Sequence, residues 1–229
     1  MLGLTKKTWV VLGSLVIFYL GVAALVAYRA RPLSPQGSAS LIYADDFDRD
    51  APGADYRTAT PDLGYETEGW KIQDGRLVGE NIHNAALWLQ QPLPERVRIE
   101  FDARAETDNG DVKCEVFGDG RNHQSGYILI FGGWKNRVTC IARLDEHAEE
   151  RKTDNRCPVR NGRARCVEPG VDYRWTIERR DGTVLWYLDG RLHLTYADTE
   201  PLMGRFFGFN NWASKTSFDN LRIYRLDTD

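Results

Sequence analysis

Polar and apolar residues alternate over much of the chain after residue 41, and short turn-rich segments separate the alternating runs. In the run 96–104, the apolar residues fill every second position: Val97, Ile99, Phe101 and Ala103. Such alternation places the apolar side chains on one face of a half-buried antiparallel strand. Further short runs of this kind, or of apolar residues, cover 112–116, 127–131, 138–144, 173–179, 184–188, 192–196, 206–209 and 218–226.

Aspartate–glycine pairs interrupt these runs. Asp181-Gly182 and Asp189-Gly190 separate three of them, and Asp74-Gly75 marks an earlier break. Such pairs favour two-residue hairpin turns. No stretch after residue 32 has the pattern of a long amphipathic helix. Many short strands joined by tight turns predict an all-β fold, a two-sheet antiparallel sandwich or jelly roll.

Residues 9–28 contain no charged side chain. As a helix they would span roughly 30 Å, the thickness of the hydrocarbon core of a bilayer. A cleaved signal peptide is the alternative, but its apolar core is usually shorter and ends in small residues, whereas Tyr28 and Arg29 stand here. The sequence therefore predicts a short tail (1–8), a transmembrane helix (9–28), a proline- and serine-containing linker (29–40) and a β domain (41–229).

The orientation of this anchor is weakly determined, because lysine and arginine residues flank both ends almost equally. Cys157 and Cys166 bracket a short polar loop, and a disulfide closing such a loop is typical of an oxidising compartment. Free thiols are the alternative. We therefore predict a cytoplasmic N-terminus and a β domain on the extracytoplasmic, periplasmic side, with the lipid bilayer as a partner. The net charge of -3 gives no reason to expect nucleic acid.

Short motifs along residues 41–226 have a familiar order. They include Asp45-Asp46-Phe47-Asp48, Trp70-Lys71-Ile72-Gln73-Asp74-Gly75, Ser125-Gly126-Tyr127, Trp186-Tyr187-Leu188-Asp189-Gly190, Gly208-Phe209-Asn210 and Phe218-Asp219-Asn220. The domain resembles the concanavalin A-like lectin/glucanase superfamily, and within it the 3-keto-disaccharide hydrolase and glycoside-hydrolase-16-like jelly-roll domains. The resemblance implies two curved antiparallel sheets packed face to face, one of which carries a groove that often holds carbohydrate.

Retaining glucanases of this fold use a Glu-x-Asp-x-x-Glu strand motif, whose two catalytic carboxylates must lie about 5–5.5 Å apart. The nearest match contains Glu100, Asp102 and Glu106, and its last acid comes one residue late. The alternative is that these side chains form the polar face of an ordinary strand. No nucleophile elbow or metal-binding motif occurs, and His147 lies in an acidic stretch that reads as charged surface. The sequence thus favours a role without catalysis.

The resemblance also implies one candidate cofactor, a structural calcium ion between the first and last strands. Asp45, Asp46 and Asp219 are its candidate ligands, since carboxylate oxygens suit calcium. The alternative is that Asp219 and Asn220 form hydrogen bonds at a strand edge.

Sugar sites combine aromatic faces with polar groups that bind hydroxyls, and two segments offer both. Trp134 follows Gly132-Gly133, and Trp212 follows two asparagines. The candidate ligand-binding residues are Trp134, Trp212, Asn210, Asn211, Tyr127, Trp88 and His123. The alternative is that these tryptophans fill the core, and the core is where we expect Trp70, Trp175 and Trp186 to lie.

Three functions compete at this stage. The first is a membrane-tethered module that binds carbohydrate or a cell-envelope polymer. The second is a non-catalytic accessory subunit of a larger membrane protein complex, with a partner membrane protein. The third, a hydrolase acting on glycosides, rests on fold analogy alone.

Overall fold

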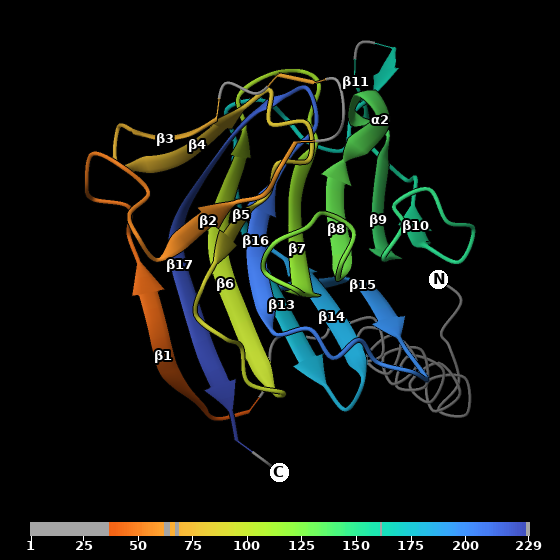
Figure 1. The fold of residues 1–229 in the computed structure, drawn as a ribbon. Coiled ribbons are helices and arrows are strands. Elements are labelled where there is room, and N and C mark those ends of the chain that lie inside the picture. The colour runs from red at the N-terminus through yellow and green to blue at the C-terminus, as the bar shows by residue number, and fades with distance from the viewer. Residues whose placement is uncertain (1–36, 62–64, 67–68, 161, 228–229) are drawn as a thin grey trace, which may run out of the picture. The chain divides into compact units, whose positions relative to one another are not determined.

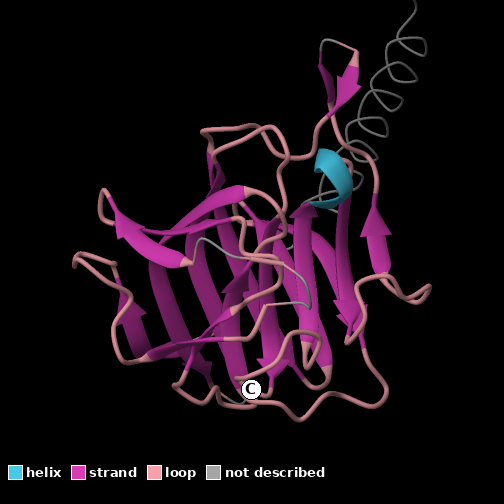
Figure 2. Cartoon of the chain, turned by 45° about the horizontal axis from the view of Figure 1, so that its top comes forward, coloured by secondary structure: helices cyan, strands magenta, loops and turns pink. Residues whose placement is uncertain are grey.

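A computed structural model gives the chain two antiparallel β-sheets that pack face to face (Figure 1). The structure describes residues 37–61, 65–66, 69–160 and 162–227. Within these residues, no helix has the length and apolarity needed to cross a bilayer. The predicted transmembrane segment 9–28 and most of the linker lie outside the described residues. The predicted all-β sandwich is confirmed, and almost every described element is a strand (Figure 2).

One sheet has eight strands. They are β1 (Ala39–Asp45), β3 (Trp70–Gln73), β4 (Arg76–Glu80), β6 (Val97–Ala105), β13 (Asp172–Arg180), β14 (Thr183–Leu188), β15 (Arg191–Ala197) and β17 (Lys215–Leu226). Their order is β15-β14-β13-β6-β17-β4-β3, and β1 also pairs with β17. The first described strand therefore lies beside the last one, as the resemblance implies.

The second sheet has seven strands, in the order β10-β9-β8-β7-β16-β5-β2. They are β2 (Tyr56–Thr58), β5 (Leu87–Leu89), β7 (Val112–Gly118), β8 (Tyr127–Gly132), β9 (Val138–Arg143), β10 (Lys152–Asp154) and β16 (Phe206–Asn210). A small hairpin of β11 (Val159–Arg160) and β12 (Arg163–Ala164) stands apart from both sheets, and a single turn, α2 (Gly133–Asn136), follows β8. Figure 1 shows α2 at the ends of β8 and β9.

The aspartate–glycine pairs close three hairpins at the predicted places. Asp74-Gly75 connects β3 to β4, Asp181-Gly182 connects β13 to β14, and Asp189-Gly190 connects β14 to β15. Both residues of each pair have positive φ. This geometry matches the right-handed twist of the strands, which explains why these residue types recur at the turns.

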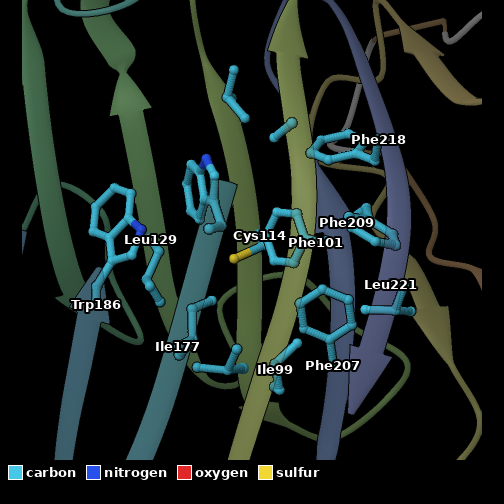
Figure 3. Packing of buried hydrophobic residues seen from close by; sticks show 14 of the residues in the cluster. Ile99, Phe101, Cys114, Leu129, Ile177, Trp186, Phe207, Phe209, Phe218 and Leu221 are labelled. Atoms are coloured by element: carbon cyan, nitrogen blue, oxygen red, sulfur yellow. The ribbon is translucent and has the colours of Figure 1, made fainter. Parts of the chain in front are cut away.

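The core lies between the two sheets, and alternation builds it. On β6, the apolar set predicted from the sequence is fully buried and faces β7 and β16 of the other sheet. Phe101 is at its centre, with ring centroids 5.3 Å from both Trp175 and Phe209. Figure 3 shows Phe101, Cys114 and Phe209 pointing into this space from different strands. Because the core uses one face of each sheet, the opposite faces are left for other roles.

Candidate functional site

The face of the seven-stranded sheet opposite the core borders a cavity of about 630 Å³. On β7, Val112 and Cys114 point into the core, so Lys113 between them points outward to this cavity. Ile130 of β8 also points away from the core and lines this cavity. We call this space the aromatic cavity, because a tryptophan of α2 and a tryptophan of the loop after β16 also line it.

Trp134 and Trp212 both line the aromatic cavity, although they lie far apart in the sequence. Trp134 belongs to α2, and its ring lies 5.7 Å from that of His147 and 4.6 Å from the Cζ of Arg151. Trp212 follows β16, and its ring packs against Tyr65 at 4.8 Å. Both tryptophan side chains are half-buried. The structure therefore brings together the two residues that we selected as the main aromatic contacts for a ligand.

A buried polar cluster (Asn84, Asp111, Lys113 and Glu146) lines the same cavity. The Lys113 Nζ donates to Glu146 Oε2 at 2.9 Å and to Asn84 Oδ1 at 3.0 Å. It lies 3.6 Å from Asp111 Oδ1, which also accepts a hydrogen bond from the Trp212 backbone N–H at 3.0 Å. The cluster therefore compensates a buried cation with two carboxylates and fixes the backbone of Trp212.

The three charged members of the cluster have shifted pKa values. Burial raises the pKa of Asp111 despite the nearby Lys113. Burial also opposes ionisation of Glu146, but the charge of Lys113 outweighs it and lowers the pKa of that carboxyl. For Lys113, burial acts to lower the pKa, and the two carboxylates raise it overall. At neutral pH, Lys113 and Glu146 form the ion pair, and Asp111 holds a proton more readily than an exposed aspartate.

A second polar network lies on the outward face of β7. Glu115 Oε1 lies 2.6 Å from His123 Nδ1 and accepts a hydrogen bond from Asn210 Nδ2 at 2.9 Å. All three side chains are nearly or fully buried, and none of them lines the aromatic cavity. His123 and Asn210 were both predicted to contact ligand. In the structure both bind Glu115 instead, and the neighbouring Gln124, whose backbone N–H donates to Glu115, lines the cavity.

The turn that carries Trp134 has an unusual backbone. Trp134, Lys135 and Asn136 have φ values of 50°, 61° and 64°, in the left-handed region that favours glycine. Gly132 before them has φ 73°, and a Cβ there would meet Asn136 Oδ1 at 2.6 Å. Consecutive left-handed residues cost on the order of 1–3 kcal/mol each and persist only where the surroundings enforce them.

Asn136 enforces this turn. Its buried side chain donates to the carbonyl oxygens of Asp108 and Val167 at 3.2 and 2.7 Å. Its Oδ1 accepts from the backbone N–H groups of Cys166 and Val167 at 3.0 and 2.8 Å. Cys166 is joined to Cys157 in a disulfide that closes the loop carrying the β11–β12 hairpin. The wall that holds Trp134 is therefore fixed by one amide side chain and a disulfide-closed loop.

Three other residues predicted to contact ligand have structural roles. Tyr127 points into the core, because on β8 it alternates with the outward-facing Ile128 and Ile130, and its hydroxyl donates to Asp198 at 2.6 Å. Trp88 is fully buried in a small cluster beside β16. Asn211 is fully buried and bonds to backbone and side-chain atoms of the protein.

The predicted catalytic carboxylates lie on the other sheet. Glu100 and Asp102 point outward from β6, and both pair with Arg174, at 2.9 and 3.3 Å. Glu106, just beyond β6, accepts a hydrogen bond from the Ser217 hydroxyl. None of them lines the aromatic cavity. The structure thus gives them the alternative role, the polar face of an ordinary strand.

The predicted calcium ligands are bound by arginines. Asp45 pairs with Arg49 at 2.6 Å, Asp46 with Arg222 at 2.5 Å, and Asp219 with Arg76 at 3.5 Å. The described parts of the chain contain no group of three or more His, Cys, Asp or Glu residues arranged to hold a metal ion. The pairing of β1 with β17 is as expected, but arginines neutralise the carboxylates there.

Sequence reasoning missed the buried cluster of Asp111, Lys113 and Glu146. Lys113 carried a usable signal, because it alternates with Val112 and Cys114 and had to face away from the core. Glu146 carried none, since it lies in a charged segment that reads as solvated surface. The structure buries it against Lys113, whereas the neighbouring His147 stays largely exposed.

A family described as a domain of unknown function (DUF6250) matches residues 120–221, less than half of the chain. A comparison with functionally curated proteins gave no match. Among solved structures, SCLam, a non-specific endo-β-1,3(4)-glucanase of family GH16, has a TM-score of 0.59 at 14% identity, over 86% of this chain and 95% of that one.

Two further solved structures show the same architecture. The catalytic domain of an endo-1,3-β-glucanase from Thermotoga petrophila RKU-1 has a TM-score of 0.57 at 12% identity, over 84% of this chain and 100% of that one. The carbohydrate-binding module CBM66 from Bacillus subtilis has a TM-score of 0.55 at 16% identity, over 75% and 96%. At these identities the likeness concerns the fold. The β domain of this chain is therefore a concanavalin A-like jelly roll.

Proposed function

We propose that the β domain binds carbohydrate in the aromatic cavity. The observation that carries this proposal is the meeting of Trp134 and Trp212 in one cavity with buried polar groups. Its volume of about 630 Å³ lies within the range of small-ligand sites, roughly 300–1,000 Å³. Solved structures with this fold include glucanases and a carbohydrate-binding module, which makes a glycan the first ligand class to test.

Different residues of the cavity would bind different parts of a sugar. Tryptophan faces pack against the apolar faces of sugar rings and contribute most of the contact area. Gln124 offers an amide group for sugar hydroxyls. The hydrogen bond from Trp212 N–H to Asp111, and the turn around Asn136, fix the two walls before the ligand arrives. Such pre-organisation reduces the entropy lost on binding.

A glycan array, followed by isothermal titration calorimetry of the best ligands, tests the proposal. The protein is the full chain, kept in mild detergent because of its apolar segment 9–28. We expect Trp134→Ala and Trp212→Ala each to weaken binding by at least tenfold, a loss of about 1.4 kcal/mol. The control is Arg191→Ala, an exposed site on β15 that does not line the cavity. Absence of binding to any glycan, or equal binding by all variants, would refute the proposal.

Cleavage of a glycosidic bond is a second candidate function, and one observation favours it. Two carboxyls, Asp111 and Glu146, line the aromatic cavity. Burial raises the pKa of Asp111, and the charge of Lys113 lowers the pKa of Glu146. A protonated acid and an ionised carboxylate are the pair that glycoside hydrolysis requires. Product release from an oligosaccharide panel, abolished by Asp111→Asn with the melting temperature retained, would support it. Turnover that survives both Asp111→Asn and Glu146→Gln would eliminate it.

We also propose that residues 9–28 tether the domain to a membrane, with the domain on the extracytoplasmic side. The uncharged length of this segment supports the tether, and the disulfide between Cys157 and Cys166 supports an oxidising compartment. Alkaline carbonate extraction should leave the chain in the membrane fraction. Protease added to spheroplasts should remove the β domain. Complete protection of that domain would show that it lies on the cytoplasmic side instead.

A further inference from the structure

We propose that the carbohydrate bound here is anionic, and that its carboxylate, sulfate or phosphate groups bind in a second, basic cavity adjoining the aromatic one. This inference rests on the proposed function and narrows its ligand class. The basic cavity has a volume of about 540 Å³ and lies between α2 and the β11–β12 hairpin. Asn109 and Lys135 line both cavities, so one extended ligand can occupy them together.

Among the described residues, four cationic side chains line the basic cavity: Lys135, Arg137, Arg163 and Arg165. Arg165 pairs with Asp108 at 2.7 Å, and Asp108 is the only acidic residue among the described residues that line this cavity. Lys135, Arg137 and Arg163 are exposed, and no carboxylate of the described chain lies within ion-pair distance of them. The cavity therefore carries an excess of positive charge, although the whole chain has a net charge of -3.

The chemistry of these groups fits an anion. A guanidinium presents a planar array of donors that matches a carboxylate, sulfate or phosphate, and an ammonium acts as a point charge. Exposed ion pairs are individually weak, but several cations in one recess act on the same ligand group. The sugar ring carrying the anionic group would then adjoin the ring held by Trp134.

The charge is held in place by the same elements that fix the aromatic wall. Lys135 lies in the left-handed turn between Trp134 and Asn136, so one strained backbone segment supplies a residue to each cavity. Arg163 belongs to the loop closed by the Cys157–Cys166 disulfide. Asn136 binds this loop to the turn through Cys166. Hydrogen bonds and the disulfide therefore anchor the backbone segments that carry Lys135 and Arg163.

The aromatic cavity does not repel such a ligand. Its two carboxylates are offset by Lys113, and burial raises the pKa of Asp111. An acidic glycan can therefore extend from the basic cavity to the tryptophans without strong repulsion from the carboxylates of the aromatic cavity. A neutral glycan would leave Lys135, Arg137 and Arg163 without a counter-charge, whereas Arg165 keeps its pairing with Asp108.

Matched glycan pairs test this inference. Each uronate-, sulfate- or phosphate-bearing oligosaccharide is compared with its neutral counterpart, obtained by carboxyl reduction, desulfation or dephosphorylation, on the full chain in mild detergent. We expect the anionic member to bind about tenfold more tightly at low salt, with the preference shrinking as ionic strength rises. Equal affinity for both members, or a preference for the neutral one, would overturn the inference.

The second part of the test compares the natural chain with a variant of the basic cavity. Arg137→Ala combined with Arg163→Ala should abolish the preference for the anionic member and leave binding of the neutral one unchanged. The matched control is Arg156→Ala, because this exposed arginine pairs with Asp154 near the same loop and does not line the cavity. Melting temperatures of all variants show that the loop remains folded. A preference retained in the double variant would contradict the inference.

The outcomes separate the two proposals. Binding of neutral glycans at the tryptophans without any preference for anions refutes only the anionic ligand. Failure of every glycan, neutral or anionic, refutes the proposed function as well. Single-stranded RNA is included as a polyanion with stackable bases, and equally tight binding of RNA would overturn the choice of a glycan.

Discussion

The outward faces of β6 and β7 have similar sequence patterns and different environments. Glu100 and Asp102 on β6 are half-buried and share Arg174 at the surface. Lys113 and Glu115 on β7 are buried beneath loops and bind other buried side chains. Alternation therefore determines which side chains leave the core. Whether the opposite face becomes solvent-exposed surface or lines a cavity depends on the loops that cover it.

This difference predicts unequal stability effects when a cation is removed from each face. Lys113→Met leaves Glu146 and Asp111 buried without their cation, which we expect to cost about 3–5 kcal/mol of unfolding free energy. Arg174→Met breaks two ion pairs of half-buried groups and should cost about 0–1 kcal/mol. Urea denaturation of both variants measures the two values. Similar costs would mean that the two faces are equivalent.

Replacing one asparagine near each face compares the β6 and β7 regions again, with a smaller expected change in unfolding free energy. Asn136 and Asn220 both have positive φ, so replacement by alanine imposes a similar backbone cost at each. The Asn136 side chain makes four hydrogen bonds beside the aromatic cavity, whereas that of Asn220 donates to Asp102 on the β6 face. At about 1 kcal/mol per bond, Asn136→Ala should destabilise the domain by about 2–3 kcal/mol more than Asn220→Ala.

The Asn136 variant should also affect binding. Loss of the left-handed turn would displace Trp134 and weaken glycan affinity, whereas Asn220→Ala should leave affinity unchanged. Equal destabilisation by the two variants, with full glycan affinity in both, would show that Asn136 does not hold the cavity wall.

The pH dependence of stability gives the smallest expected effect. Lys113 outweighs burial at Glu146, so the pKa of this carboxyl is lower in the folded chain than its ordinary value of 4.5. Such a group contributes stability above the unfolded pKa and loses it as the pH falls toward the folded pKa. Denaturation midpoints should therefore decline below about pH 4.5, and less so in Glu146→Gln. A Glu146→Gln profile as steep as that of the natural chain would show that Glu146 does not contribute.

Much of the fold could be predicted because its determinants are local. Alternation identified the buried set on β6, and three aspartate–glycine pairs identified hairpin turns. The prediction for Tyr127 failed for an equally local reason: it shares a strand face with Leu129 and Phe131, which are core residues. Counting its position within β8 would have excluded it from the outward face.

The candidate site was only partly predictable, because it is assembled from segments distant in the sequence. Trp134 was selected because it follows two glycines and Trp212 because it follows two asparagines, and the structure places both at one cavity. Glu146 meets Lys113 only because its loop folds over the seven-stranded sheet. Trp88 was wrongly predicted to contact ligand. The sequence does not reveal which tryptophans are buried by segments distant in the chain. Tertiary contacts of this kind leave no periodic signal in the sequence.

Oxidative footprinting with a bound glycan tests the central claim most directly, because it reports which tryptophans the ligand covers. The full chain is labelled with and without its best glycan, and tryptophan oxidation is measured by mass spectrometry. We predict protection of Trp134 and Trp212 and no change at Trp70, which is also half-buried but lies on the eight-stranded sheet. Protection of Trp70 alone, or unchanged oxidation of Trp134 and Trp212 under saturating glycan, would contradict the account.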